Sequence, residues 1–174
     1  MKDFMKIVNM LIAKLAIFLL TLNLSLIAHA DKLDSESSFL TAKNEQINFE
    51  KYDENVLIVH FWATWFQPSY LELQELDQLQ KDYRKKPLKV IAISEDFKDL
   101  EIIKDYYKKY NIKHLEIFVD PKNALFKKML IKSLPFSFIV DKNYNIIEIL
   151  PGTVNWKDPK IRKSLDQLTA EKPI

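Results

Sequence analysis

The side chains capable of chemistry gather around one short stretch of this 174-residue chain, FWATWFQPSY at residues 61–70. His60 precedes the stretch, Ser69 lies within it, and Glu72 follows it closely. Serine with histidine is the pair used in hydrolysis, but no G-x-S-x-G turn surrounds Ser69. Ser69 is expected in the first turn of a helix, where capping the helix is a sufficient role. A serine hydrolase is therefore not predicted.

Metal chemistry is not predicted either. Once the first 30 residues are set aside, the soft or imidazole ligands are only Met129, His60 and His114. Each histidine is expected within or at the start of a strand, and no cluster of ligands accompanies it in the sequence. We expect no metal ion and no other cofactor.

The chain contains no cysteine. Structural disulfides and every thiol reaction are therefore excluded, even for a protein that is exported to an oxidising compartment. About 140 residues remain after a leader is removed, and a core of that size is sufficient for folding by apolar burial.

Two strand–helix units flank the chemically capable stretch. Residues 56–62 and 88–94 are nearly continuous apolar runs, typical of strands buried on both faces. A helix is predicted to begin at Pro68, because leucines then recur at helical spacing. A second amphipathic helix is predicted over 96–111.

The C-terminal third changes its pattern. A short strand (115–120) and a short helix (123–130) precede two strands, 135–141 and 145–150, joined by a tight turn in which asparagine supplies the left-handed φ angle. A closing helix over 158–168 has Asp158 as N-cap. This order predicts an α/β domain with a mixed central sheet and helices on both faces. The single glycine, Gly152, argues against a glycine-built phosphate site.

The first 30 residues are typical of a signal peptide. Lys2 and Lys6 precede the apolar run at 15–28, and AHA at 28–30 provides small residues for cleavage. Cleaved export is favoured over a retained anchor, which would be the only membrane contact expected. Residues 31–45 are polar and aperiodic and are predicted to be a flexible lead-in. Beyond residue 30 there are 23 basic and 23 acidic residues, so no nucleic-acid partner is predicted.

Residues 56–73, VLIVHFWATWFQPSYLEL, resemble the active-site strand, turn and helix of thioredoxin-like proteins, above all the exported TlpA/ResA-type thiol:disulfide oxidoreductases. The positions that match their pattern are Phe61, Trp62, Ala63, Thr64, Trp65, Pro68 and Glu72. Residues 133–147 resemble the family's cis-proline loop and hairpin, with Pro135 as the proline. The resemblance covers about residues 46–168 and implies a thioredoxin-like domain over 46–170.

The departures from that family determine the functional prediction. Phe66 replaces the attacking cysteine and Ser69 replaces the resolving one. Thiol–disulfide exchange needs a thiolate and a second thiol, so the resemblance without its sulfur implies a redox-inactive domain. The alternative is the family's own role, in disulfide reduction or cytochrome c maturation. Glu72 matches the family's acid, although an acid favoured by the helix dipole explains it more simply.

The resemblance also implies a binding groove, because the backbone of Leu134 beside a cis-proline could pair with an extended peptide. The predicted groove residues are Trp65, Phe66, Gln67, Pro68, Tyr70, Leu134, Pro135 and Phe136. Trp62 is a further aromatic residue of this region and is expected in the core. Two alternatives stay open: the loop persists because the fold needs it, and Phe66 folds inward as a plug. We expect a protein or peptide partner in the cell envelope, or a degenerate paralogue without a specific role.

Overall fold

The computed structural model describes residues 32–96 and 100–170. The predicted signal peptide, 1–30, lies outside these residues. Within the described part of the chain, none of the helices has the length and apolar character needed to cross a membrane. The description below concerns the compact unit that begins at Leu33.

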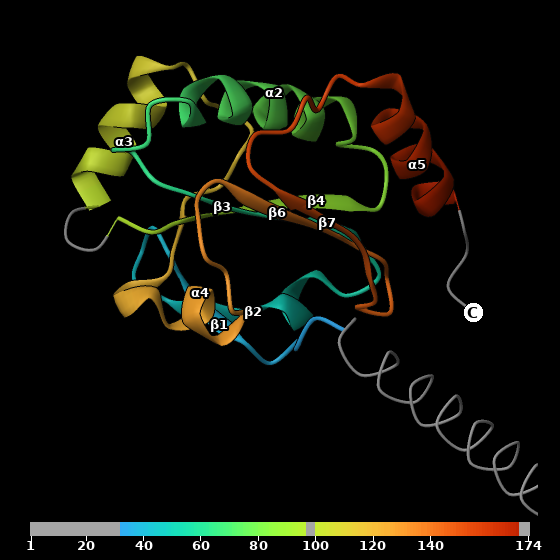
Figure 1. Ribbon diagram of the computed structural model, residues 1–174, viewed down its shortest axis with the longest axis horizontal. Coiled ribbons are helices and arrows are strands. Elements are labelled where there is room, and N and C mark those ends of the chain that lie inside the picture. The colour runs from blue at the N-terminus through green and yellow to red at the C-terminus, as the bar shows by residue number, and fades with distance from the viewer. Residues whose placement is uncertain (1–31, 97–99, 171–174) are drawn as a thin grey trace, which may run out of the picture. The chain divides into compact units, whose positions relative to one another are not determined.

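A seven-stranded mixed sheet organises this unit (Figure 1). Its strands, in the order in which they pair across the sheet, are β2 (Gln46–Asn48), β1 (Ser38–Thr41), β5 (Phe118–Val119), β4 (Leu88–Ser94), β3 (Val56–Trp62), β6 (Phe136–Val140) and β7 (Ile146–Pro151). The central strands β3, β4 and β5 are parallel, whereas β6 and β7 run antiparallel to their neighbours. The predicted mixed α/β sheet is confirmed.

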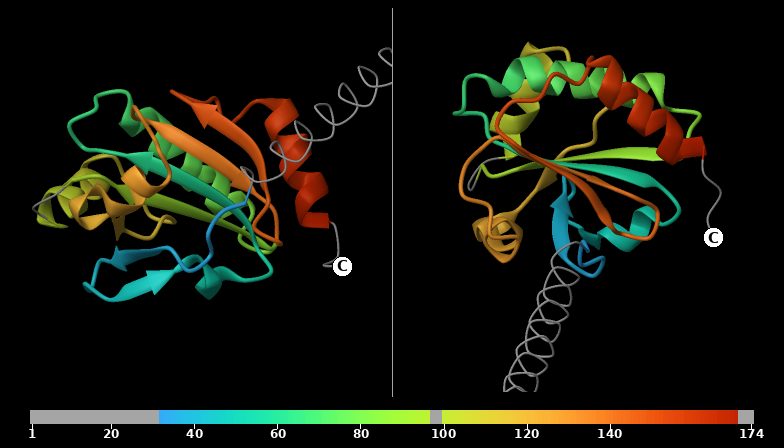
Figure 2. Two further views of the ribbon diagram at one scale, coloured as in Figure 1. Left: turned by 60° about the horizontal axis from the view of Figure 1, so that its bottom comes forward. Right: turned by 45° about the vertical axis from the view of Figure 1, so that its right-hand side comes forward.

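Helices cover both faces of the sheet, as Figures 1 and 2 show. The α2 helix (Ser69–Asp82), α3 (Leu100–Lys109) and α5 (Pro159–Ala170) enclose one core with the even-numbered residues of β3 and β4. On the other face, α4 (Ala124–Lys128) and the short helix η1 (Phe49–Tyr52) pack on the odd-numbered residues. A second short helix, η2 (Pro121–Asn123), leads into α4. Because β3 is buried on both sides, six of its seven residues are apolar, and the exception is the buried His60.

The predicted flexible lead-in over 31–45 is wrong for residues 38–41, which form β1. This strand pairs with both β2 and β5, and so it is an integral part of the sheet. Its single fully buried side chain, Phe39, lies between Phe49 and Phe118, with ring centroids 5.0 and 5.2 Å away. One apolar residue in a polar stretch gives no periodic signal, although here it anchors a strand.

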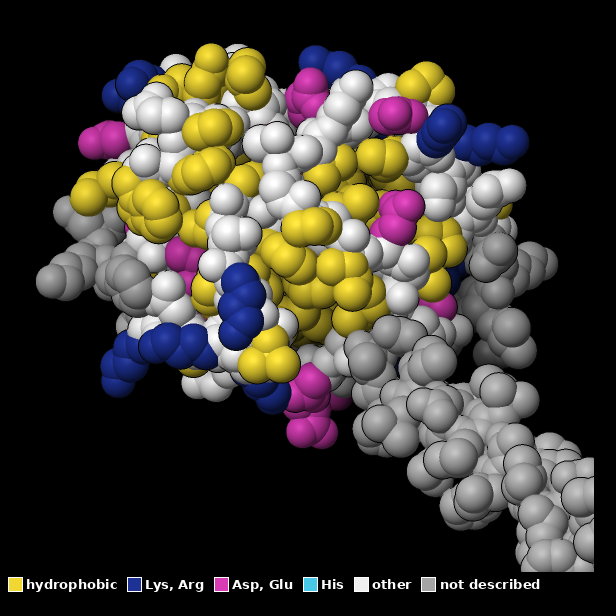
Figure 3. Space-filling model, in the orientation of Figure 1, with side chains coloured by type: hydrophobic (Ala, Val, Ile, Leu, Met, Phe, Trp, Pro, Cys, Tyr) yellow, Lys and Arg dark blue, Asp and Glu magenta, His cyan; other side chains and the backbone are white. Residues whose placement is uncertain are grey.

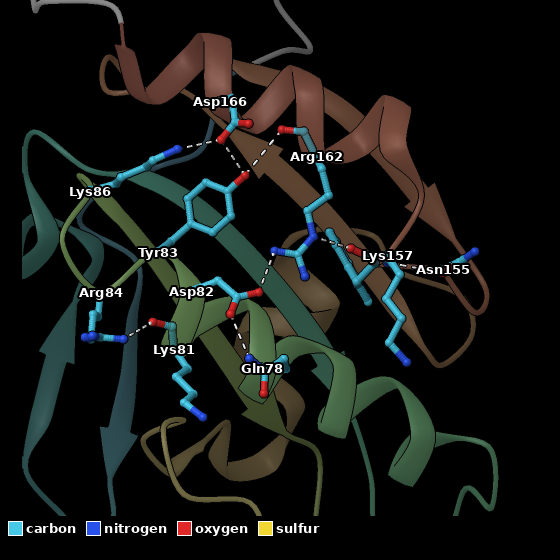
Figure 4. A network of polar contacts seen from close by, with 11 residues as sticks. Gln78, Lys81, Asp82, Tyr83, Arg84, Lys86, Asn155, Lys157, Arg162 and Asp166 are labelled. Atoms are coloured by element: carbon cyan, nitrogen blue, oxygen red, sulfur yellow. Dashed lines mark hydrogen bonds and ion pairs between the residues drawn. The ribbon is translucent and has the colours of Figure 1, made fainter.

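The last helix, α5, is joined to the C-terminal end of α2 by polar contacts (Figure 4). Arg162 Nη1 pairs with Asp82 Oδ2 at 3.2 Å, and the Tyr83 hydroxyl donates to Asp166 Oδ1 at 2.8 Å. Lys86 Nζ lies 2.6 Å from the same Asp166 oxygen. These contacts hold α5 against the C-terminal end of α2.

Two local predictions have opposite outcomes. Asp158 accepts the backbone N–H of Lys160 at 2.7 Å, which confirms it as the N-cap of α5. In the turn between β6 and β7, the left-handed φ of 65° belongs to Tyr144 and not to an asparagine. The reason is that Asp141 accepts the backbone N–H groups of Asn143 and Asn145, and this fixes which residue takes the unusual conformation.

Candidate functional site

The turn after β3 brings Phe66 and Ser69 to the start of α2. The Phe66 N–H donates to the Ala63 carbonyl at 3.2 Å, and the Ser69 N–H donates to the Phe66 carbonyl at 3.0 Å. The carboxylate of Asp96 secures the beginning of the turn by accepting both the N–H and the hydroxyl of Thr64, at 2.8 and 2.7 Å. The turn therefore keeps the arrangement of positions 66 and 69 that could bring two thiols together, although neither position holds a cysteine.

Ser69 does not cap α2, contrary to our expectation. It is the first helical residue, and Pro68 before it has helical φ and ψ angles, so the extended geometry of a capping residue is absent. The Ser69 side chain is fully buried. Its Oγ atom has no hydrogen-bond partner among the described residues.

The loop before β6 lies at the same end of the sheet. Phe136 is the register partner of Phe61, so Leu134 and Pro135 continue alongside the end of β3. The peptide bond between Leu134 and Pro135 is cis, as the resemblance implies. The Pro135 carbonyl accepts the N–H of Gly152 at 3.0 Å. Within residues 32–96 and 100–170, no hydrogen bond reaches the backbone of Leu134.

The predicted aromatic residues divide between the surface and the interior. Trp65 is 65% exposed, whereas Trp62 is fully buried beside Tyr106, as expected for a core residue. Phe66, Leu134 and Phe136 are half-buried, Pro135 is buried, and Gln67 and Pro68 are exposed. The ring of Tyr70 stacks on that of Tyr110, directly after α3, with centroids 4.9 Å apart. Tyr70 is therefore engaged in a contact within the domain.

Glu72 is 3% exposed and belongs to a buried polar cluster. Its Oε1 accepts the indole Nε1–H of Trp156 at 3.0 Å and the N–H of Val154 at 3.2 Å, and its Oε2 has no partner among the described residues. Burial raises the pKa of Glu72 to about 7, although the two hydrogen bonds lower it in part. The helix dipole is thus an incomplete explanation of this acid, because its carboxylate fixes the loop before α5.

His60 lies beside Glu72 without forming an ion pair with it. The distance from His60 Nδ1 to Glu72 Oε1 is 3.8 Å, and Nδ1 is 2.9 Å from the hydroxyl of Ser137. Complete burial lowers the pKa of His60 to about 3, so the imidazole is neutral. His60 is a packed strand residue. Among the described residues no three potential ligand side chains lie together as a metal site requires.

An open groove of about 400 Å³ adjoins the turn on the side of Glu72. One wall is Pro68 together with Leu71 and Glu75 of α2, and the other is the loop of residues 153–155. Leu71 is exposed, so this wall presents an apolar side chain to solvent. The sequence pattern missed Leu71 and the loop, since residues 82 positions apart, such as Glu72 and Val154, meet only after α5 packs on α2.

A second buried acid lies at the ends of the neighbouring strands. Glu95, directly after β4, donates its N–H to the Trp62 carbonyl at 2.8 Å and is 1% exposed. Neither carboxyl oxygen has a hydrogen-bond partner among the described residues. Burial, reinforced by the negative charges of Asp120 and Asp96, raises the pKa of Glu95 to about 8. The acid is therefore mostly protonated at neutral pH.

A thiol-disulfide oxidoreductase is among the known proteins whose sequences are similar to this chain. Thiol-disulfide oxidoreductase ResA of Bacillus thuringiensis subsp. konkukian (strain 97-27) is 26% identical over 110 residues, which are 63% of this chain and 62% of ResA. The chain thus spans less than two thirds of that relative's length.

Solved structures show the fold. A putative thiol:disulfide interchange protein DsbE from Chlorobium tepidum aligns with a TM-score of 0.64 at 23% identity, covering 79% of this chain and 94% of that one. The pneumococcal exposed lipoprotein thioredoxin Etrx1 from Streptococcus pneumoniae strain TIGR4 aligns with a TM-score of 0.63 at 20% identity, covering 76% and 98%. The fold is thioredoxin-like.

Residues 31–149 match the AhpC/TSA family, which is more than half of the chain. The match contains the β3–α2 turn with Phe66 and Ser69, the cis-proline loop and Glu72. The chain belongs to the AhpC/TSA family.

Proposed function

We propose that this protein is an exported, redox-inactive thioredoxin-like domain that binds an extended segment of another protein beside its cis-proline loop. The chain has no thiol to attack or resolve a disulfide. The cis-proline loop and the exposed aromatic side chain of the β3–α2 turn are nonetheless present. The proposal is carried by the unpaired backbone of Leu134 and the exposed ring of Trp65, which lie in the segments that adjoin the paired ends of β6 and β3.

The backbone of Leu134 supplies the polar part of recognition. An extended segment could donate to and accept from this residue as an added strand, which gives affinity without dependence on side chains. Leu134 is half-buried and lies two residues before the start of β6 at Phe136, separated from the strand by Pro135.

Apolar side chains supply the hydrophobic part of recognition. Trp65 is 65% exposed and Phe66 is half-buried on the same turn. Large aromatic residues contribute a disproportionate share of the binding free energy in protein interfaces. The groove at Leu71 extends this apolar surface toward the 153–155 loop. A bound segment with two or more apolar side chains would therefore fit the site.

The experiment places a photo-reactive amino acid at position 66 and identifies proteins that cross-link to it in the cell envelope. Affinity for a captured partner is then measured with Trp65→Ala and Leu134→Pro, which removes the backbone N–H. Each change should weaken binding roughly tenfold or more.

Ile102→Ala is the matched control, because Ile102 is an exposed apolar residue of α3 and is not among the predicted groove residues. It should leave affinity unchanged. Capture of no partner, or equal loss of affinity with all three variants, would contradict the proposal. Insulin reduction by the purified chain should remain at the background rate, and clear turnover would restore the oxidoreductase alternative.

A further inference from the structure

The C-terminus of α4 places a leucine where a helix normally ends in glycine. The Leu130 N–H donates to the Lys127 carbonyl at 3.0 Å and the Ile131 N–H donates to the Phe126 carbonyl at 3.2 Å, the two bonds of a Schellman cap. Leu130 has a left-handed φ of 55° and is 73% exposed. Both its conformation and its exposure are unfavourable for a branched apolar residue.

The α3 helix provides an internal comparison, because it ends in the same cap. The Asn111 N–H donates to the Lys108 carbonyl, the Ile112 N–H donates to the Tyr107 carbonyl, and Asn111 has a φ of 56°. Asparagine tolerates this conformation much better than leucine does. The domain therefore uses a suitable residue at one cap and an exposed leucine at the other.

Lysines flank Leu130 in the sequence. Residues 121–140 contain four lysines and no acidic residue. Lys122, Lys127 and Lys132 are exposed and have no carboxylate partner among the described residues, whereas Lys128 pairs with Asp34. In Figure 3, dark-blue side chains gather at the lower left over α4 and its flanking loops, beside a broad yellow area. We call Lys122, Lys127, Leu130 and Lys132 the α4 tip.

The upstream part of the chain joins the domain next to this tip. Leu33 donates its N–H to the Tyr144 carbonyl, and the following residue, Asp34, forms the ion pair with Lys128 of α4. The chain before this junction contains the apolar run of residues 15–28. In a chain that retains this run, the alternative to cleavage, a tether to a lipid surface would bring the α4 tip near the same surface.

We propose that the α4 tip contacts an anionic lipid surface, with Leu130 at the interface and the three lysines beside the headgroups. Lysines near such a surface are attracted by its negative potential, and one exposed leucine adds apolar contact. An acidic protein would satisfy the lysines equally well. The lipid surface is favoured because the covalent junction to an apolar segment lies at the tip.

The test uses the unprocessed full-length chain, synthesised in the presence of lipid vesicles. Because the chain has no cysteine, Leu130→Cys accepts a single environment-sensitive fluorophore. Gln167→Cys, exposed on α5 on the opposite face of the sheet, is the control position. Quenching by spin-labelled lipid is compared in phosphatidylcholine vesicles with and without phosphatidylglycerol.

We expect quenching at position 130 that requires phosphatidylglycerol and greatly exceeds quenching at position 167. In the Leu130→Cys background, Lys127→Glu should reduce the ratio of contacting to free domains by more than roughly fivefold, the factor for one lysine near an anionic surface, because the change also adds a negative charge. Lys163→Glu on α5 should have no effect. Equal quenching at both positions, quenching without anionic lipid, or absence of quenching, as an acidic protein partner would give, overturns the proposal. Circular dichroism confirms that each variant is folded.

Discussion

Glu72 Oε1 and Trp156 Nε1 are joined by a hydrogen bond of 3.0 Å that links the first turn of α2 to the loop before α5. The two residues are 84 positions apart, and both are buried. The same carboxylate oxygen accepts the N–H of Val154, so one side chain fixes the loop that forms a wall of the groove.

Removal of the indole donor should destabilise the domain. Trp156→Phe leaves Glu72 buried without its side-chain donor, and we expect a loss of about 1–3 kcal/mol in the free energy of unfolding. Glu72→Gln keeps an accepting oxygen at the same place and should cost less. Urea unfolding of both variants at pH 7 is the measurement. An equal loss in the two variants would show that the hydrogen bond contributes little.

Glu95 should make the protein less stable as the pH rises. The pKa of Glu95 is about 8 in the folded protein, against 4.5 for an exposed glutamate, so between these values the folded state holds one more proton than the unfolded state. The contribution to the free energy of unfolding therefore falls by roughly 1.4 kcal/mol per pH unit across this window.

The measurement is urea unfolding of Glu95→Gln and of the parent protein between pH 5 and pH 8.5. The glutamine cannot ionise, so the variant should be more stable than the parent at pH 8 and show a weaker dependence on pH. Glu148→Gln, on exposed β7, is the control and should leave the pH dependence unchanged. A parallel pH dependence in Glu95→Gln and the parent would argue against a raised pKa.

Replacement of either of two buried serines by alanine should change the free energy of unfolding, in opposite directions for the two sites. Ser69 Oγ lacks a hydrogen-bond partner among the described residues, so Ser69→Ala removes an unsatisfied polar atom and should be neutral or stabilising by up to about 1 kcal/mol. Ser137 hydrogen-bonds His60, and Ser137→Ala should destabilise by about 1–3 kcal/mol. Thermal and urea unfolding measure both, and a destabilised Ser69→Ala would reveal a partner for that hydroxyl.

Cysteines should restore redox chemistry if the turn retains its geometry. Ser69 and Phe66 are joined by a backbone hydrogen bond of 3.0 Å across the start of α2. The double variant Phe66→Cys/Ser69→Cys should form an intramolecular disulfide and reduce insulin disulfides. Each single variant is the control and should give only the background rate. A double variant that keeps two free thiols under oxidising conditions would show that the turn cannot bring them together.

The two helix caps allow a reciprocal exchange. Leu130→Asn relieves a leucine from the left-handed conformation and should stabilise the domain by about 1 kcal/mol, whereas Asn111→Leu should destabilise it by a similar amount. Unfolding free energies of the two variants are compared with the parent. If Leu130→Asn is also destabilising, Leu130 makes intramolecular contacts that compensate for its conformation.

Much of the fold could be predicted from local patterns. The continuous apolar runs at 56–62 and 88–94 are the two central strands, with the predicted bounds, because a strand buried on both faces admits few polar residues. The strand β1 could not be predicted in this way, because only Phe39 is fully buried in it. Pairing with β2 and β5 stabilises β1 as a strand, although its own sequence carries no periodic apolar signal.

The candidate site divides similarly. The sequence by itself determined that no thiol chemistry is available, since that conclusion depends only on which atoms the chain contains. Tertiary structure decided that Tyr70 stacks on Tyr110, that Glu72 holds the loop before α5, and that Leu71 faces a groove. Each of these results depends on segments distant in sequence that meet only when the helices pack on the sheet, and a local pattern carries no record of such contacts.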